Sequence, residues 1–322
     1  MRGRRYPHVA ALMRATRGAG FDPAGPRGAL APTTRRLHKF PMCIRASRAV
    51  AFAAALVVGT AAACAAPWPQ SSAAVVEFES PLATPQPLQG YLRQPAGAGP
   101  SAAVVLLHSC NGSWARLDER WGKKIAAWGY VTLTVDSFGP RGIKNTCNSG
   151  APVDLAFDAY RALDFLVRKP FVDPGRVAVL GFSQGGWLAL ASVEHGAIEQ
   201  SAKNKFRAAL AFYPRCLGSK GNMTVPTLIL IGERDDWAPA QECRNMVEGR
   251  DDWGISRTSG RGVAVRLVVY PEARHGFDVP GLRTPTEFLG HRLEYDKSAA
   301  ERASDAVHEF LDGQLGGKAK AP

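Results

Sequence analysis

From residue 73 onward, short apolar runs alternate with longer segments in which apolar residues recur every three or four positions. Apolar runs of about 4–8 residues are typical of strands, and the longer spacing is typical of helices. The pattern predicts strands over 73–80, 88–95, 102–108, 130–136, 176–182, 207–213, 226–232 and 263–270. It predicts helices over 115–129, 153–169, 184–195, near 239–248 and near 296–314.

The order of these elements predicts an α/β fold. The first two strands form an antiparallel start, and most later strands are separated by crossover helices, which favours a mostly parallel sheet with helices on both faces. No internal repeat or second domain boundary interrupts the pattern, so we expect one domain over 74–316 and a flexible tail over 317–322. In such a sheet, reactive side chains collect at the carboxyl ends of the strands.

One serine lies where a predicted strand meets a predicted helix, in the pentapeptide Gly181-Phe182-Ser183-Gln184-Gly185. This is the arrangement of a nucleophile elbow, in which a tight turn brings the flanking positions together and only small side chains avoid a clash. The helix that begins at Gln184 directs its first N–H groups toward a developing oxyanion. The pentapeptide alone is also compatible with an ordinary turn serine, but its place between strand and helix favours a nucleophile.

A serine hydroxyl needs a base and an acid that orients the base. His275 follows the strand 263–270 in a loop beside Gly276, and Asp235 lies just past the strand 226–232. The order Ser183, Asp235, His275 is the one expected of an α/β-hydrolase. Alternatively, Asp235 or its neighbour Asp236 caps the following helix, and His275 is an ordinary loop histidine. No H-E-x-x-H or C-x-x-C cluster is present, so we expect no metal and no cofactor.

The formal charge of +12 is concentrated at the N-terminus. Residues 1–66 hold 11 of the 40 Lys and Arg but one of the 28 Asp and Glu, so residues 67–322 hold 29 and 27. The expected domain is therefore nearly neutral, and nucleic acid is not expected as a partner.

The N-terminal segment has the layout of a secretory leader. A basic stretch after Met42 precedes the apolar run "AVAFAAALVVGTAAA", small residues and Pro67, which predicts a signal peptide over 42–66. Residues 1–41 then form a disordered basic extension, and 67–73 a linker. The apolar run is short and rich in alanine, so no permanent membrane span is expected. Cleavage by a signal peptidase and lipidation of Cys64 both stay open, and the protein is expected to be exported, periplasmic or secreted.

Four cysteines follow the expected leader: Cys110, Cys147, Cys216 and Cys243. An even number in an exported chain suggests disulfides. Four cysteines allow three pairings, and their positions after successive strands favour 110–147 and 216–243. Four unlinked thiols are the alternative.

From about Val75 to Leu315 the chain resembles the dienelactone hydrolase family of α/β-hydrolases. The similar blocks, in the family's order, are "GYLRQP", "VVLLHSCNG", "WGYVTLTVDSFGPRG", "GFSQGG", "LIGERDDWAPA" and "YPEARHGFD". The resemblance implies the triad Ser183, Asp235 and His275. It also implies an oxyanion hole made by the backbone N–H groups of Gln184 and Cys110.

The chain departs from the best-known members of that family in two respects. It has a serine where they have a cysteine, and "HSCNGS" offers no glutamate to steer a thiol. Arg141 either binds a substrate carboxylate, as arginines do in that family, or is a structural loop residue. Trp114, Phe138, Trp187 and Trp237 either line an acyl pocket or pack in the core. Hydrolysis is expected, but dienelactone does not follow as the substrate.

The sequence therefore predicts a serine hydrolase that cleaves a small-molecule carboxylic ester or lactone through an acyl-enzyme. An acyl-protein thioesterase shares a motif like GFSQGG, but the Gly and Phe after His275 and the block "DSFGPRG" argue against it. The pattern is also compatible with an acyltransferase and with an exported binding protein that has a hydrolase scaffold but no catalytic activity.

Overall fold

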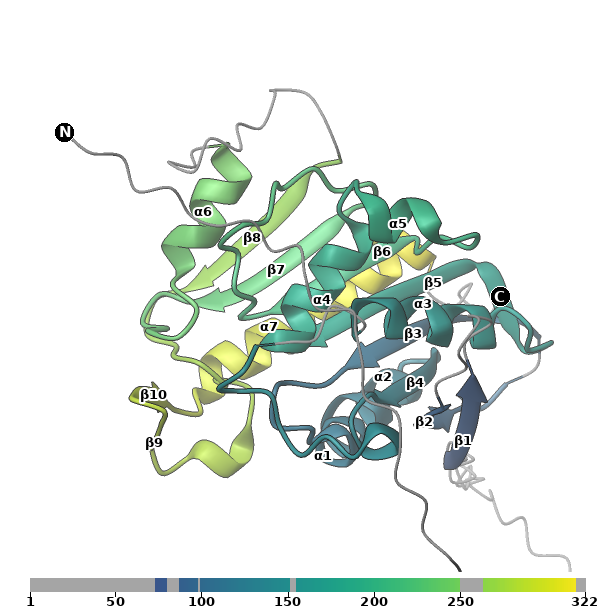
Figure 1. Ribbon diagram of the computed structural model, residues 1–322, viewed down its shortest axis with the longest axis horizontal. Coiled ribbons are helices and arrows are strands. Elements are labelled where there is room, and N and C mark those ends of the chain that lie inside the picture. The colour runs from purple at the N-terminus through teal and green to yellow at the C-terminus, as the bar shows by residue number, and fades with distance from the viewer. Residues whose placement is uncertain (1–72, 80–86, 98, 151–154, 250–262, 317–322) are drawn as a thin grey trace, which may run out of the picture. The chain divides into compact units, whose positions relative to one another are not determined.

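The computed structural model describes residues 73–79, 87–97, 99–150, 155–249 and 263–316 (Figure 1). The expected extension 1–41, signal peptide 42–66, tail 317–322 and the lipidation candidate Cys64 lie outside the described residues. So does the expected linker, except that its last residue, Ala73, is the first residue of strand β1.

An eight-stranded sheet forms the centre of the fold, in the order β1-β2-β4-β3-β5-β6-β7-β8. β1 pairs antiparallel with β2 and β2 with β4, while the pairs from β4–β3 through β7–β8 are parallel. The mostly parallel sheet with an antiparallel start is therefore confirmed. The strands are β1 (Ala73–Glu79), β2 (Pro87–Arg93), β3 (Ser101–Leu107), β4 (Val131–Asp136), β5 (Val172–Phe182), β6 (Ala208–Phe212), β7 (Thr227–Gly232) and β8 (Val265–Tyr270).

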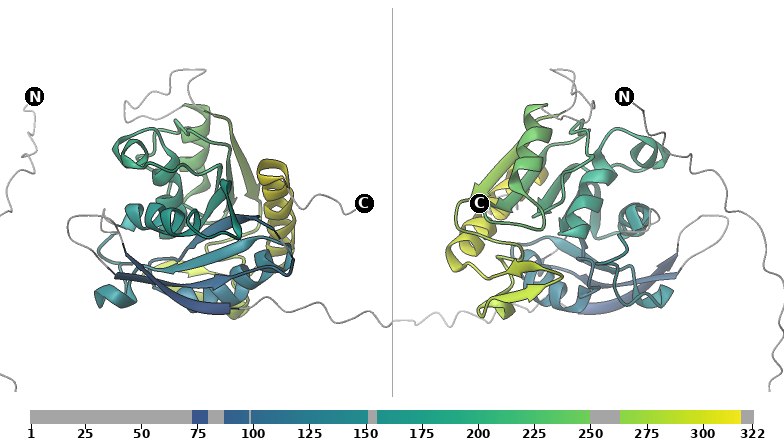
Figure 2. Two further views of the ribbon diagram at one scale, coloured as in Figure 1. Left: turned by 90° about the vertical axis from the view of Figure 1, so that its right-hand side faces the viewer. Right: turned by 60° about the vertical axis from the view of Figure 1, so that its left-hand side comes forward.

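Helices cover both faces of the sheet (Figure 2). On one face, α7 lies beside the helical segment before β4, where Trp128 stacks on His308 of α7. On the other face, α3 and α4 pack together against the central strands. The helices are α1 (Trp114–Leu117), α2 (Lys123–Ala127), α3 (Leu155–Leu166), α4 (Gln184–Val193), α5 (Ala197–Ser201), α6 (Ala240–Glu248) and α7 (Lys297–Leu315).

The helix expected over 115–129 is interrupted by a π-helical turn, η1 (Asp118–Gly122). The wider turn accompanies the buried carboxylate of Asp118, which accepts hydrogen bonds from Arg93 Nε at 2.9 Å and Thr134 Oγ1 at 3.1 Å. A Cβ at Gly122 would lie 2.3 Å from Asp118 Oδ1, so the glycine makes room for this carboxylate. Hydrophobic spacing does not reveal such a turn, because the polar contacts that accompany it are made with residues of other strands.

Five short elements were not expected from the sequence: α5, the 3₁₀ turns η2 (Gly139–Arg141) and η3 (Pro280–Leu282), and a hairpin of β9 (Thr286–Phe288) and β10 (His291–Leu293). Strands of three residues are too short to show a period of two. The hairpin turns at Leu289 and Gly290, both with positive φ. It is held to the histidine loop by a bridge between Leu293 and His275.

The core lies on both sides of β3, β5 and β6, whose residues at the carboxyl ends are buried. This rigid centre holds the turn after β5 in place. Within the described ranges, no helix is long and apolar enough to cross a bilayer.

Candidate active site

Ser183 occupies a strained turn between β5 and α4, with φ 54° and ψ −115°. Its backbone N–H donates to the carbonyl oxygen of Phe212 on the neighbouring strand at 2.9 Å. A Cβ at Gly181 would lie 1.9 Å from the Gly185 carbonyl oxygen, and a Cβ at Gly185 would lie 2.3 Å from the Leu107 carbonyl oxygen. Glycine is therefore required on both sides, and the strain is held by the surrounding strands.

His275 connects Ser183 to Asp235. Its Nε2 lies 2.9 Å from Ser183 Oγ, and its Nδ1 lies 2.8 Å from Asp235 Oδ2. A carboxylate can only accept, so Nδ1 carries the proton and Nε2 accepts from the serine hydroxyl. The second carboxylate oxygen, Oδ1, accepts from the backbone N–H groups of Trp237 and Ala238 at 2.9 and 2.8 Å. Asp235 and His275 are both 4% exposed, which strengthens their interaction in a medium of low dielectric constant.

The neighbouring Asp236 has a different position. It is exposed, and its nearest described partners are His291 Nδ1 at 3.6 Å and the backbone N–H of Arg292 at 3.5 Å. Neither aspartate caps α6 by its side chain, since Pro239 occupies the N-cap position. The structure thus places Asp235, and not Asp236, against His275.

The loops after β7 and β8 are fastened together. Arg234 N donates to the Ala273 carbonyl at 3.0 Å, and Glu233 N donates to the Tyr270 carbonyl at 2.9 Å. A Cβ at Gly232 would lie 2.2 Å from the Ala273 carbonyl oxygen. Because backbone hydrogen bonds join the two loops, they fix the spacing between the carboxylate of Asp235 and the imidazole of His275.

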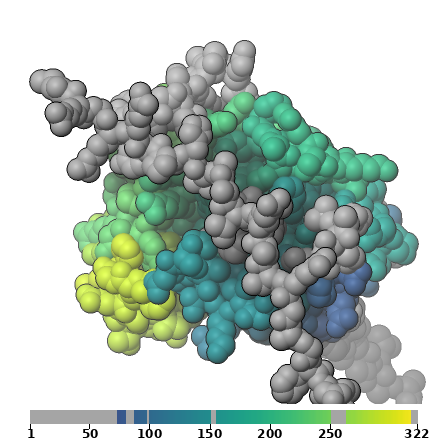
Figure 3. Space-filling model, viewed as in Figure 1, coloured from purple at the N-terminus to yellow at the C-terminus, as the bar shows by residue number. Residues whose placement is uncertain are grey.

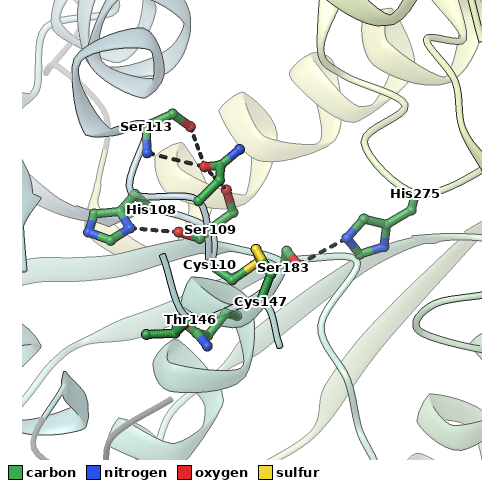
Figure 4. The surroundings of a disulfide bond; sticks show 10 residues. His108, Ser109, Cys110, Ser113, Thr146, Cys147, Ser183 and His275 are labelled. Atoms are coloured by element: carbon green, nitrogen blue, oxygen red, sulfur yellow. Dashed lines mark hydrogen bonds between the residues drawn. A yellow bond between two sulfur atoms is a disulfide. The ribbon is translucent and has the colours of Figure 1, made fainter. Parts of the chain in front are cut away.

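The turn after β3 lies beside the elbow (Figure 4). The Cys110 carbonyl accepts from Thr146 N at 2.8 Å, and the Thr146 hydroxyl donates to Gln184 Oε1 at 2.7 Å. Within the described ranges, the backbone N–H groups of Cys110 and Gln184 have no acceptor. Two free N–H groups beside a serine hydroxyl are what an oxyanion hole requires.

Two disulfides are present, Cys110–Cys147 and Cys216–Cys243, the pairing that the strand positions favour. The first ties the turn after β3 to the loop 139–150 next to Ser183 (Figure 4). The second ties the loop after β6 to α6.

Two cavities meet at Ser183 and His275, and Tyr213 and Trp237 border both. One, of about 490 Å³, extends past the Cys110–Cys147 disulfide to Trp187, Arg215 and Leu217. The other, of about 250 Å³, lies between the segment 109–120 and the residues 276–293, including Phe288 of the hairpin. In the space-filling view, the yellow surface that includes β9 and β10 touches the blue-teal surface that includes α1 (Figure 3). A substrate bound at Ser183 therefore has room on two sides.

The structure separates the residues considered for substrate binding. Trp187 and Trp237 line the larger cavity, whereas Phe138 is 2% exposed and packs edge-on against His108. Trp114 lies outside both cavities, stacked on Tyr91. The aromatic side chains near the motifs thus divide evenly between cavity lining and packing.

Of the two roles considered for Arg141, the contacts of its guanidinium favour the structural one over substrate binding. Its guanidinium donates to both oxygens of the buried Asp158 at 2.5 and 2.7 Å and to the Ser137 carbonyl at 2.7 Å. It lines neither cavity at Ser183. Its charge is therefore used to hold the loop 137–142 onto α3.

Three residues close to the site had no separate signal in the sequence: Tyr213, Asp278 and His108. Tyr213 contacts the imidazole of His275, and Asp278 accepts the Tyr213 hydroxyl. His108 is buried, and burial lowers its pKa; Ser137 N donates to its Nε2 at 3.3 Å, consistent with a neutral ring. The block "HGFD" contains Asp278, but nothing local indicates what it contacts. Within the described ranges, no group of three or more His, Cys, Asp or Glu is arranged to hold a metal ion.

The sheet order, the elbow and the Ser–His–Asp arrangement at the carboxyl ends of β5, β7 and β8 define an α/β-hydrolase fold. Residues 88–315 match the dienelactone hydrolase family, so the chain belongs to that family of ester-bond hydrolases. The resemblance seen in the sequence blocks is thereby confirmed.

Three solved structures show a similar fold. A dienelactone hydrolase-like promiscuous phosphotriesterase, P91, from metagenomic libraries is 20% identical, with a TM-score of 0.58 over 77% of this chain and 100% of its own. A dienelactone hydrolase from Klebsiella pneumoniae is 17% identical, with a TM-score of 0.57 over 74% and 98%. Thermogutta terrifontis esterase 2, in a structure phosphorylated by paraoxon, is 20% identical, with a TM-score of 0.55 over 78% and 98%.

Two curated relatives match this chain over only part of their own length. Lipase 1 of Moraxella sp. is 30% identical over 126 residues, which is 39% of this chain and 36% of the lipase. Acylamino-acid-releasing enzyme 1 of rice is 24% identical over 233 residues, which is 55% of this chain and 28% of that enzyme. The chain thus spans about a third of the length of these curated relatives.

Proposed function

We propose that this protein is a serine hydrolase that cleaves small carboxylic esters or lactones through an acyl-enzyme. The observation that carries the proposal is the continuous set of hydrogen bonds from Ser183 Oγ through His275 to the buried Asp235. A hydroxyl with an imidazole nitrogen at 2.9 Å and a carboxylate behind it is the arrangement that activates serine.

In the proposed reaction, His275 Nε2 takes the Ser183 proton while Oγ attacks the substrate carbonyl carbon. The carbonyl oxygen becomes an oxyanion that accepts from the N–H groups of Cys110 and Gln184. Collapse of this intermediate breaks the ester bond, and the imidazolium returns its proton to the departing alcohol. Water then attacks the acyl group with His275 as base, releasing the acid and the free serine. Asp235 keeps the Nδ1 proton in place throughout.

The competing functions differ in which molecule accepts the acyl group, or in whether an acyl-enzyme forms at all. A thioesterase and an acyltransferase use the same first step, and a binding protein without catalytic activity uses none. The buried acid, the elbow strain and the unpaired N–H groups support a reactive serine, because a binding site alone has no need of them.

The proposal predicts covalent labelling by an organophosphate. Incubation with paraoxon is expected to add one diethylphosphoryl group, detected by intact mass, and tryptic mapping should place it on Ser183. Ester hydrolysis should fall in proportion to the labelled fraction. Thermogutta esterase 2, which has the same fold, has been captured phosphorylated by paraoxon.

Ser183→Ala is the control for this experiment and should remain unlabelled. An unmodified mass after complete exposure, or a label on another residue with full ester turnover, would contradict the proposed nucleophile. An alcohol acceptor that lowers the yield of free acid would favour an acyltransferase.

The proposal also gives the Cys110–Cys147 disulfide a measurable effect. Losing an oxyanion donor costs ~10²–10³ in kcat, and freeing the turn that holds Cys110 N is expected to cost up to about 10²-fold. Replacing both cysteines by alanine should also lower the free energy of unfolding by about 2–4 kcal/mol. Denaturant unfolding and steady-state kinetics measure the two effects.

The matched control is the pair Cys216→Ala and Cys243→Ala, since neither cysteine lines a cavity at Ser183. It should lose similar stability and keep kcat within about threefold. Equal kcat for both double variants would show that the first disulfide does not support catalysis.

We propose further that the protein acts outside the cytoplasm. Two disulfides in a chain of this size are typical of an oxidising compartment. The partner expected there is a small ester or lactone. Mass measurement of the mature N-terminus tests the leader and the lipidation of Cys64.

A further inference from the structure

Tyr213 has a backbone conformation that tyrosine rarely adopts. It directly follows β6, with φ 37°, and its N–H donates to the Leu230 carbonyl on β7 at 2.7 Å. A non-glycine residue in this region is strained, and such strain is retained where the surroundings hold the residue in place. The residue before it, Phe212, accepts the Ser183 N–H, so the strained position adjoins the elbow.

The side chain of Tyr213 contacts the base of the triad. Its ring centroid lies 4.7 Å from that of His275, and the ring also lies beside Phe277. The hydrogen bonds of the imidazole to Asp235 and Ser183 are made by its two ring nitrogens and leave the faces of the ring without support. Contacts on the ring are therefore needed to keep Nε2 aimed at the serine hydroxyl.

The far end of Tyr213 is anchored by a buried carboxylate. The hydroxyl donates to Asp278 Oδ1 at 2.6 Å, and Oδ2 accepts from Trp121 Nε1 at 2.7 Å. Arg120 Nε lies 3.0 Å from the same Oδ2 and balances the charge. Burial, helped by the negative charge of Asp278, raises the pKa of Tyr213 well above its usual value, so the phenol keeps its proton.

Asp278 and His275 belong to the same short loop. The loop thus supplies the proposed base, His275, and three residues later Asp278, which accepts the hydroxyl of Tyr213. The ring of Tyr213 in turn contacts His275. Arg120 and Trp121 come from η1, far from this loop along the chain, so the anchor connects distant segments. An ordinary packing contact does not need a buried charge with three partners.

We propose that Tyr213, anchored by Asp278, is a positioning residue that fixes the imidazole plane of His275 for proton transfer with Ser183. This rests on the proposed serine mechanism and adds a group outside the triad to it. A misplacement of the base by about 1 Å can cost 10²-fold in rate. Loss of the hydroxyl, which loosens the anchor and leaves the ring, is expected to cost about tenfold.

The test is Tyr213→Phe, with kcat, KM and the rate constant of paraoxon labelling as readouts. We expect kcat and the labelling rate constant each to fall about tenfold, and KM to stay within about twofold, because the cavity lining is unchanged. A purely structural role would lower the melting temperature and leave these rates unchanged.

Tyr270→Phe is the matched control. Tyr270 is also 3% exposed and packs against Phe277, but its hydroxyl has no hydrogen-bond partner in the described part of the chain. Removing that hydroxyl should leave kcat and the labelling rate as in the unchanged protein.

Wild-type kcat and labelling rate in Tyr213→Phe would overturn the proposal. If that variant does not fold, Asp278→Ala takes its place with the same expected fall in kcat, and wild-type rates there would overturn it equally. If neither variant folds, the pair belongs to the fold and the proposal is wrong. Absence of labelling in the unchanged protein would instead reject the serine mechanism itself.

Discussion

Replacing Ser183 by alanine is expected to lower kcat for p-nitrophenyl butyrate by on the order of 10⁶-fold, as removal of the nucleophile does in other serine hydrolases. The change removes only one oxygen atom. The elbow keeps its backbone bond to Phe212, and the backbone N–H groups of Cys110 and Gln184 stay in place. Residual catalysis of about 10³–10⁴ over water is expected from the oxyanion hole and substrate binding.

The fold of this variant should be unchanged, because alanine meets the same backbone strain as serine at φ 54°. Ser192→Ala is a matched control: Ser192 is buried on α4, the helix that follows Ser183, and its hydroxyl donates to the Ala189 carbonyl at 2.8 Å. It should hydrolyse the ester at the wild-type rate. If Ser183→Ala kept more than about 1% of the activity, the reaction would not use this hydroxyl as nucleophile.

The second largest effect is expected for Asp235→Asn, at about 10⁴-fold in kcat. The two backbone N–H groups of Trp237 and Ala238 hold one side-chain oxygen, so the new amide NH₂ must face His275 Nδ1. That contact requires Nδ1 to accept, which moves the ring proton to Nε2. A ring protonated at Nε2 cannot take the proton of Ser183.

The adjacent position provides the control. Asp236→Asn should change kcat by less than about twofold, because Asp236 is exposed and faces His291 rather than His275. Comparable losses in the two variants would indicate that the loop as a whole matters. A loss in Asp236→Asn alone would assign the acid to that residue and contradict the geometry.

Both predictions depend on features that differ in how well the sequence reveals them. The elbow could be predicted because its requirements are local: two glycines, a strand before the serine and a helix after it. The order of serine, acid and histidine could be predicted because each follows an apolar run, and parallel strands end at one edge of the sheet. The central strands and main helices could be predicted because the spacing of apolar residues is also a local property of the sequence.

Partners of polar side chains could not be predicted in this way. Asp235 and Asp236 are adjacent and chemically identical, and only the path of the loop after β7 directs one of them to the imidazole. Arg141 lies in a loop beside the site, yet the buried carboxylate of Asp158 on α3 takes its charge. The roles of such residues are set by what packs against them.

By itself, then, the sequence determined the strands of the sheet, the elbow and the position of the proposed nucleophile, because these depend on backbone geometry over a few successive residues. Tertiary structure alone decided which of two neighbouring aspartates contacts His275, the anchoring of Tyr213 by Asp278 and the hairpin beside the second cavity. Those features arise where segments far apart along the chain meet. Burial and charge pairing across such contacts leave no periodic signal in the order of the residues.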